Sequence, residues 1–135
     1  MPAELTDADY AALAEFRFSL RQFQAFSEIQ AGNCGLTPQQ HQALLVIRAA
    51  PQGAATVGHV AERLILKPHS ATGLIDRLVA LGHVQRLPSP HDKRQSLLEL
   101  TPLAHETLES LSAVHRDEIR RLRPMLLALL DKLQD

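Results

Sequence analysis

The sequence predicts a mainly α-helical protein with one small β-hairpin wing, an α+β fold in a single domain. Hydrophobic residues recur at spacings of three and four over most of the chain, as they do in amphipathic helices. Only residues 84–100 suggest short β-strands instead. The 135 residues, 45% of them hydrophobic and 21% charged, suffice for one hydrophobic core but not for two. We therefore expect residues 1–135 to form one domain.

Composition excludes several classes of protein. Fourteen Lys and Arg against fifteen Asp and Glu give a net charge of −1, unlike a globally basic nucleic-acid binder or a disordered chain. No apolar run approaches the ~20 residues that cross a bilayer, and the first residues are acidic, unlike a secretory signal. We expect a cytoplasmic protein with no membrane association. The single Cys34 cannot form a disulfide within the chain.

Residues 7–31 are expected to form a long first helix. Leu13, Phe16, Leu20 and Phe23 follow helical spacing, and further apolar residues widen this surface beyond one stripe. A helix that is apolar on more than one side needs more than one neighbour, so a partner subunit is one candidate neighbour.

Three shorter helices follow. Thr37 and Pro38 are a typical N-cap and first helical residue, and the helix that they begin ends near residue 50. A helix of about two turns begins after Thr56. The fourth helix is expected over residues 68–81, with Gly82 following its last turn.

The fourth helix has two distinct faces. At 100° per residue, one face is apolar and consists of Ala71, Leu74, Ile75 and Leu78. The opposite face is small and polar and consists of His69, Gly73, Asp76 and Ala80, flanked by Ser70, Thr72 and Arg77. Because it lacks the long side chains that usually solvate an exposed helix, this face can approach another surface closely.

A hairpin and two more helices complete the chain. Residues 84–87 and 96–100 predict two strands, joined by an eight-residue tip with two prolines and a basic pair. Such a tip suggests a semi-rigid arm that reaches away from the body. Thr101 and Pro102 begin a fifth helix, and a separate leucine-rich helix is expected to have Pro124 near its start.

Two helices joined by a short turn and followed by a hairpin with a basic tip have the layout of a winged helix-turn-helix. Residues 56–101 contain six basic and four acidic residues, a net of +2, whereas the rest of the chain carries −3. Binding to nucleic acid would thus depend on a few placed cations and on two subunits acting together.

Residues 74–86 contain a helix, a glycine and a strand with an arginine, and Asp92-Lys93-Arg94 and Leu100-Thr101 follow them. These motifs give the sequence a resemblance to the MarR family of transcription regulators. The resemblance implies a homodimer formed by dimerisation helices at about residues 7–31 and 102–135, with a DNA-binding lobe at about 36–101. It also implies a repressor of a palindromic operator in double-stranded DNA, relieved by a small effector.

The resemblance assigns DNA-binding roles to individual residues. The fourth helix would enter the major groove, Arg77 and Lys93 would reach phosphates, and Arg94 would enter the minor groove. Asp92 would hold either Arg94 or the loop. The residues placed near base edges are Pro68, His69, Ser70, Thr72 and Gly73. Because no Arg, Asn or Gln stands in the first turns, we expect DNA shape and phosphate contacts to carry much of the affinity.

Other functions have less support. In a protein-assembly module without DNA binding, the polar face of the fourth helix would contact a protein, and the basic pair would be a solvated loop. No Ser/His/Asp set, phosphate-binding glycine loop or paired carboxylate has an interpretable spacing, so we expect neither an enzyme nor a cofactor.

The effector is harder to read from the sequence. The phenylalanines of the first helix and the apolar face of the fifth could form a pocket for a small aromatic effector, or simply core and dimer interface. Family members that sense peroxide carry their cysteine near the start of the first helix, whereas Cys34 follows that helix. Glu28, Cys34, His41 and His115 lie near the positions of zinc ligands in zinc-sensing members. The expected HxxxH pair is absent, so isolated surface histidines are favoured and no metal site is expected.

Overall fold

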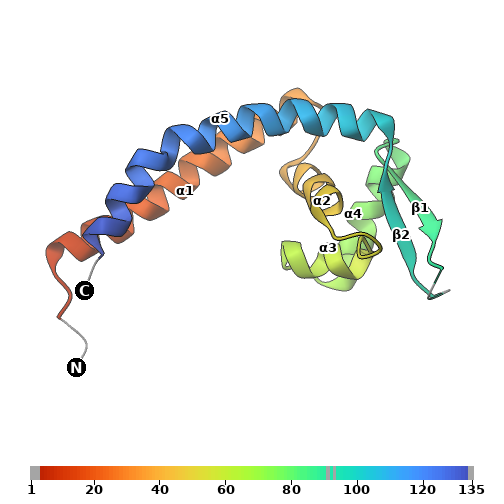
Figure 1. Ribbon diagram of the computed structural model, residues 1–135, viewed down its shortest axis with the longest axis horizontal. Coiled ribbons are helices and arrows are strands. Elements are labelled where there is room, and N and C mark those ends of the chain that lie inside the picture. Colours follow the sequence, from red (N-terminus) through yellow and green to blue (C-terminus); the bar gives the residue numbers. More distant parts are fainter. Residues whose placement is uncertain (1–3, 91, 93, 134–135) are drawn as a thin grey trace.

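The computed structural model describes residues 4–90, 92 and 94–133 and confirms the predicted class, mainly helical with one antiparallel hairpin. In chain order, the elements are α1 (Asp7–Asn33), α2 (Pro38–Ala49), α3 (Val57–Leu64), α4 (Pro68–Ala80), β1 (Val84–Pro88), β2 (Ser96–Leu100) and α5 (Pro102–Lys132) (Figure 1). Within the described residues, no helix combines the length and the apolarity needed to cross a membrane.

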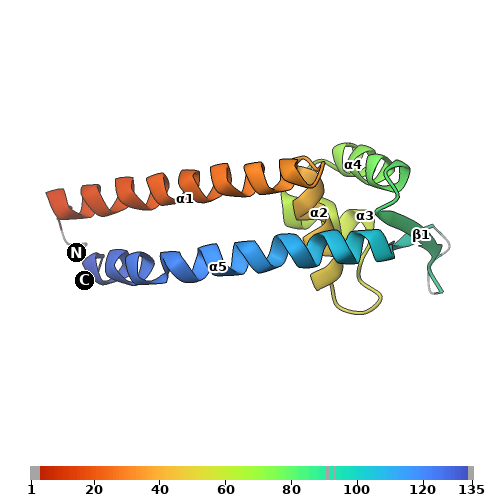
Figure 2. The same cartoon turned by 90° about the horizontal axis from the view of Figure 1, so that it is seen from above.

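The molecule consists of a lobe and an arm. α2, α3, α4 and the hairpin gather at one end as the lobe, from which α1 and α5 extend side by side as the arm (Figures 1 and 2). α1 runs toward the lobe and α5 runs away from it. The arm is only two helices thick, so much of its surface is open to another molecule.

Threonine caps set the start of four helices. The hydroxyl oxygens of Thr6, Thr37, Thr56 and Thr101 each accept a hydrogen bond from the backbone N–H three residues later. These bonds satisfy N–H groups that lack a partner in the first turn. α4 differs, because its N-cap Lys67 provides no side-chain acceptor.

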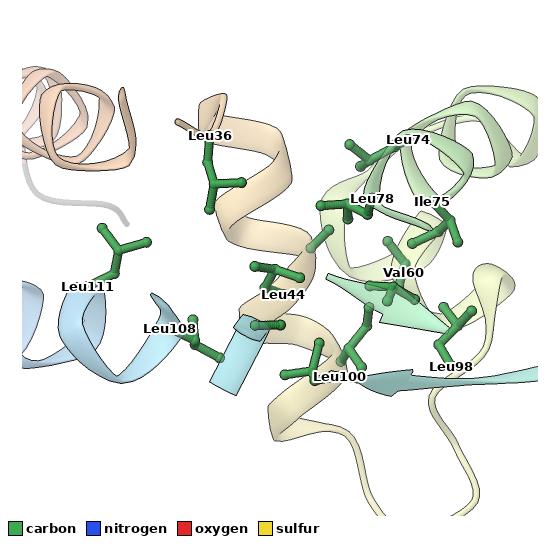
Figure 3. Packing of buried hydrophobic residues seen from close by; sticks show 14 of the residues in the cluster. Leu36, Leu44, Val60, Leu74, Ile75, Leu78, Leu98, Leu100, Leu108 and Leu111 are labelled. Carbon is green, nitrogen blue, oxygen red and sulfur yellow. The ribbon is translucent and has the colours of Figure 1, made fainter. Parts of the chain in front are cut away.

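The hydrophobic core lies in the lobe, where α2, α3, α4, both strands and the start of α5 meet (Figure 3). Its largest fully buried side chains are Leu44, Val60, Ile75, Leu78 and Leu111. Leu111 belongs to the arm helix α5, so the core connects the arm to the lobe.

The end of the chain differs from the prediction. Two helices were expected there, with Pro124 near the start of the second, whereas α5 is one continuous helix that contains Pro124. Leu111 and Leu129 are both buried, and their separation of 18 residues is five helical turns. One continuous helix therefore keeps both leucines on the same side. This packing offsets the hydrogen bond that Pro124 cannot donate.

Small residues form the buried side of α1. Leu13, Phe16 and Leu20 of the predicted apolar stripe are exposed, whereas the buried residues include Ala12 and Ser19. Small side chains let α5 approach closely, and the Ser19 hydroxyl lies 3.5 Å from the Met125 sulfur. The larger apolar residues consequently face outward along the arm.

The hairpin is slightly longer than predicted. Its pairing begins at Pro88 and Ser96, so the tip has seven residues, 89–95, rather than eight. The Leu98 N–H donates to the Ala55 carbonyl oxygen at 2.7 Å, which ties the loop between α2 and α3 to β2. The middle of β2 is therefore attached to the rest of the lobe.

The turn between α3 and α4 contains a strained residue. Ile65 has a φ of 54°, a left-handed conformation that is unfavourable for a β-branched residue, and its side chain is 92% exposed.

Ile65→Asn should raise the free energy of unfolding by about 1 kcal/mol, because asparagine tolerates this conformation. Urea denaturation measures the change. Ile29→Asn, at an exposed position inside α1, is the matched control and should give no gain; an equal response of the two variants would contradict the expectation.

Candidate nucleic-acid interface

The two faces of α4 lie as the sequence predicts. Ala71, Leu74, Ile75 and Leu78 are buried against the lobe. Gly73 is half-buried, and the exposed predicted residues on this helix are Pro68, His69, Ser70, Thr72 and Arg77. The structure thus brings the predicted α4 residues together on one solvent-facing surface.

The hydrogen bonds at the start of α4 determine which of its polar groups remain free to bind another molecule. The Thr72 hydroxyl donates to the Pro68 carbonyl oxygen at 3.0 Å, so its proton is already engaged and its methyl group and lone pairs remain. Lys67 does not cap the first backbone N–H groups, which are therefore without a side-chain acceptor at that position.

The carboxylate of Asp92 organises the backbone of the wing tip. Its Oδ1 accepts a hydrogen bond from the Arg94 backbone N–H at 2.9 Å, and its own N–H donates to the Ser89 hydroxyl at 3.3 Å. Of the two predicted roles for Asp92, these bonds support holding the loop. The Arg94 residue is exposed. Lys93, the other predicted wing cation, lies outside the described residues.

An ion pair braces α4 against the wing. The Arg86 guanidinium on β1 lies 2.6 Å from the Asp76 carboxylate on α4, and both side chains are partly exposed. Arg86 is one of the six basic residues in the window 56–101, but no sequence pattern relates it to Asp76, because the two residues lie on different elements. The pair places opposite charges side by side and joins β1 to α4.

Two hydrogen bonds join the turn after α4 to the start of α5. The Thr101 hydroxyl donates to the Gly82 carbonyl oxygen at 2.6 Å, and the Thr101 N–H donates to the His83 carbonyl oxygen at 3.0 Å. The same hydroxyl oxygen caps α5. Thr101 therefore holds the turn after α4, the wing and the start of α5 in one arrangement.

A few cations remain available on this side of the lobe. In the part of the chain that the structure describes, Arg77 and Arg94 make no ion pair. Arg63 and Lys67, on either side of the turn before α4, also make none there. The surface thus combines a small polar helix face with separate positive charges, as the electrostatics of binding a polyanion requires.

Three comparisons with known proteins agree on the family. The MarR family model matches residues 35–95. The multiple antibiotic resistance protein MarR of Salmonella typhimurium is 37% identical over 67 residues, 50% of this chain and 45% of that protein. An HTH-type transcriptional regulator of Mycobacterium bovis is 35% identical over 98 residues, 62% of this chain and 68% of the relative. The chain belongs to the MarR family.

Similarity to solved MarR-family structures extends over both lobe and arm. AbsC from Streptomyces coelicolor aligns with a TM-score of 0.76 and 23% identity over 97% of this chain and 92% of that chain. A mutant of Escherichia coli MarR complexed with operator DNA aligns with a TM-score of 0.69 and 24% identity over 98% and 100% of the two chains. AbsC is a MarR family transcriptional regulator, and at under 25% identity these likenesses show the shared fold. The aligned part of this chain spans about half the length of the Salmonella MarR protein, 45%.

In this MarR-family chain, a cavity of about 850 Å³ lies between the arm and the lobe. Its apolar lining includes Phe23, one of the predicted pocket residues. Its polar lining includes Ser27, Glu28, His41, His115, Arg116 and Arg120. Volume and lining are typical of a small-molecule site.

The four predicted metal candidates do not form a complete site. His41 and His115 are neighbours, with ring centroids 4.8 Å apart, and Glu28 lines the same cavity. Cys34 is exposed in the turn after α1. Over residues 4–90, 92 and 94–133, no group of three or more His, Cys, Asp or Glu side chains could hold a metal ion. The prediction of isolated surface histidines is nevertheless wrong for His41 and His115, because His41 is buried and the two rings are in contact.

Proposed function

We propose that this MarR-family chain regulates transcription by binding double-stranded DNA as a homodimer. The observation that carries the proposal is the exposed polar face of α4 beside a wing that is braced against it by Asp76 and Arg86. The solved structure of an E. coli MarR mutant with operator DNA has the same fold, which supports this use of the surface. A rigid pair of helix and wing fits the adjacent grooves of one DNA duplex.

The contacts follow from the chemistry of each side chain. α4 lies in the major groove, where the Thr72 methyl group meets a thymine methyl and the Ser70 hydroxyl meets a base edge. Arg77 and Lys93 bind phosphates, and Arg94 reaches the minor groove. Pro68, His69 and Gly73 allow close approach at the start of the helix. Affinity thus depends on phosphates and DNA shape more than on bidentate base contacts.

A second copy of the chain covers the arm. Large apolar side chains are exposed along both of its helices, including Tyr10, Leu13, Phe16, Phe18, Leu20, Ile119, Leu127, Leu130 and Leu133. A surface of this extent on a two-helix arm is unusual for a monomer. A symmetric dimer presents two α4 helices, and its target is therefore a palindromic operator.

The protein acts as a repressor that a small aromatic molecule releases. The cavity at the joint of arm and lobe has an apolar lining with Phe23, and Arg116 and Arg120 add positive charge. An aromatic effector bound there would contact α1, α2 and α5 together, so it would bias how the lobe sits on the arm. A change in lobe position alters the spacing of the two α4 helices and weakens DNA binding.

Selection from a random DNA library tests this function directly. We expect enriched sequences to be inverted repeats, with half-sites one helical turn, roughly 10–10.5 base pairs, or a multiple of this apart. Enrichment of a single unrepeated site would contradict the dimer. No enrichment at all would favour the protein-assembly function, in which α4 contacts a protein.

Gly73→Ala separates folding from DNA binding. A Cβ at Gly73 would meet nothing within 4 Å, so no contact within the described chain requires glycine in this helix. Alanine should stabilise the fold by about 0.5–1 kcal/mol. It should also weaken DNA binding by about tenfold, because the added methyl group prevents the closest approach.

Thermal unfolding and fluorescence anisotropy with an enriched DNA sequence measure the two effects of Gly73→Ala. Gly32→Ala is the matched control, because a Cβ at Gly32 of α1 also meets nothing within 4 Å. The control should leave DNA affinity unchanged. If Gly73→Ala binds as tightly as the wild type, the outer face of α4 does not approach DNA closely.

A further inference from the structure

Three helices meet at His115 of α5. The rings of Phe23 and Phe26 on α1 lie edge-on to the His115 ring, at centroid distances of 5.9 Å and 5.4 Å. The ring of His41 on α2 lies 4.8 Å away. The His41–His115 pair therefore lies at the joint where the lobe is attached to the arm.

Hydrogen bonds fix the His115 ring. Its Nδ1 is 2.7 Å from the Leu111 carbonyl oxygen and must donate to it, since a carbonyl only accepts. Its Nε2 is 2.8 Å from the Ser27 hydroxyl, which can donate to the neutral ring. A protonated ring can keep both contacts, because the Ser27 oxygen also accepts. His115 thus tolerates either protonation state at this position.

His41 has no such alternative. Only 4% of the residue is exposed, and its Nδ1 is buried with no hydrogen-bond partner among the described residues. Burial and, secondly, the nearby His115 lower the pKa of His41. The ring is therefore neutral near pH 7, and a proton on it is accommodated only if the packing around it changes.

The other charged groups at this joint do not compensate for a positive charge on the buried His41 ring. Arg116 and Arg120 on α5 line the same cavity, as does Glu28 on α1. Arg116 is itself paired with Asp117, at 3.9 Å. These groups therefore supply no net negative charge that would offset two protonated rings.

We propose that the His41–His115 pair makes the joint acid-sensitive: when both rings carry a proton, α2 separates from α5 and the lobe shifts relative to the arm. The repulsion acts across the surface that joins the two parts of the molecule, because the rings come from opposite sides of it. This property is independent of the proposed DNA binding, since it concerns the packing of the chain alone.

The pH window follows from the direction of the shift. A state in which His41 is solvated has an ordinary histidine pKa of about 6.5, above that of the packed state. The separated state thus binds more protons as the pH falls below about 6.5. Above this pH, the lobe is fully packed on the arm. Below it, the equilibrium constant that favours the packed state over the separated state falls by up to roughly tenfold per pH unit, until the lowered pKa of His41 is reached.

Nuclear magnetic resonance of the imidazole side chains tests the coupling. In the full-length protein, His115→Gln should raise the pKa of His41, because the charge that opposes its protonation is gone. His105→Gln is the matched control, since His105 is an exposed histidine on the same helix, and it should leave His41 unchanged. An equal pKa of His41 in the wild type and in folded His115→Gln would overturn the proposal.

Electron spin resonance distance measurements test the movement. Spin labels at the exposed positions Arg17 on α1 and Glu62 on α3, in a Cys34→Ser background, report the separation of arm and lobe. Dilution with unlabelled protein limits the signal to one subunit. The distance distribution should change between about pH 7.5 and about pH 5 in the wild type. It should change less in His115→Gln; identical distributions at both pH values in the wild type would overturn the proposal.

Discussion

Arg94→Ala should weaken DNA binding by roughly two to four orders of magnitude for the dimer, across all DNA sequences. Each subunit would lose a contact between a charged group and DNA, worth about 1.5–3 kcal/mol. The slope of log affinity against log salt should become flatter by about one unit per subunit, because fewer counterions are released. Fluorescence anisotropy over a salt series measures both effects. The exposed position of Arg94 on the wing and its lack of an ion pair within the described residues are the basis for this prediction.

The control for Arg94→Ala is Arg123→Ala. Arg123 is an exposed arginine on α5, in the arm, and its removal changes the net charge by the same amount. It should leave both affinity and slope close to the wild type. Equal losses in the two variants would mean that general charge, and not the wing, attracts DNA. No loss in Arg94→Ala would favour the protein-assembly function.

Leu130→Asp should dissociate the dimer. Leu130 is 65% exposed in the single chain, so the substitution should leave the fold of the subunit intact. In a symmetric dimer, it would place two carboxylates in an apolar contact and remove two buried leucine side chains, each worth about 1.5–3 kcal/mol. The dissociation constant should rise by at least about a hundredfold. Sedimentation equilibrium measures it.

Leu103→Asp is the matched control for the dimer. Leu103 is 50% exposed and lies on the same helix, in its first turn, at the opposite end of α5 from Leu130. It should remain dimeric. A Leu130→Asp protein that is also dimeric would show that the exposed apolar residues near the end of α5 do not form the interface.

Much of the lobe could be predicted because its signals are local. The helical period of α4 identified its buried side, and Ala71, Leu74, Ile75 and Leu78 are all buried. Threonine caps marked the starts of α2, α3 and α5, since capping depends on neighbouring residues only. The change of period after Gly82 located the hairpin.

The arm was harder to predict because its packing depends on distant residues. The spacing of Leu13, Phe16 and Leu20 showed an apolar stripe on α1, but it could not show that α5 packs on the small residues beside it. Pro124 usually interrupts a helix, and only the contact between α1 and α5 shows why it does not end α5 here.

The pairs that could not be predicted from the sequence join residues of different elements. Asp76 and Arg86 lie ten residues apart on a helix and a strand, and no periodic pattern relates them. His41 and His115 come from α2 and α5, and each appeared to be a single scattered histidine in the sequence. Such pairs depend on the tertiary fold and become visible only when the elements are placed in space.

The most direct test is an electrophoretic mobility shift with the wild-type protein and the DNA upstream of its own gene, over a series of salt concentrations. We predict a shifted band at low salt that weakens steeply as salt rises, with a slope of about −0.9 for each phosphate that the dimer contacts. Zinc, a chelator and peroxide, added in turn, would show whether any of them releases the DNA. The absence of a shift at low salt would contradict the proposal that α4 and the wing bind DNA.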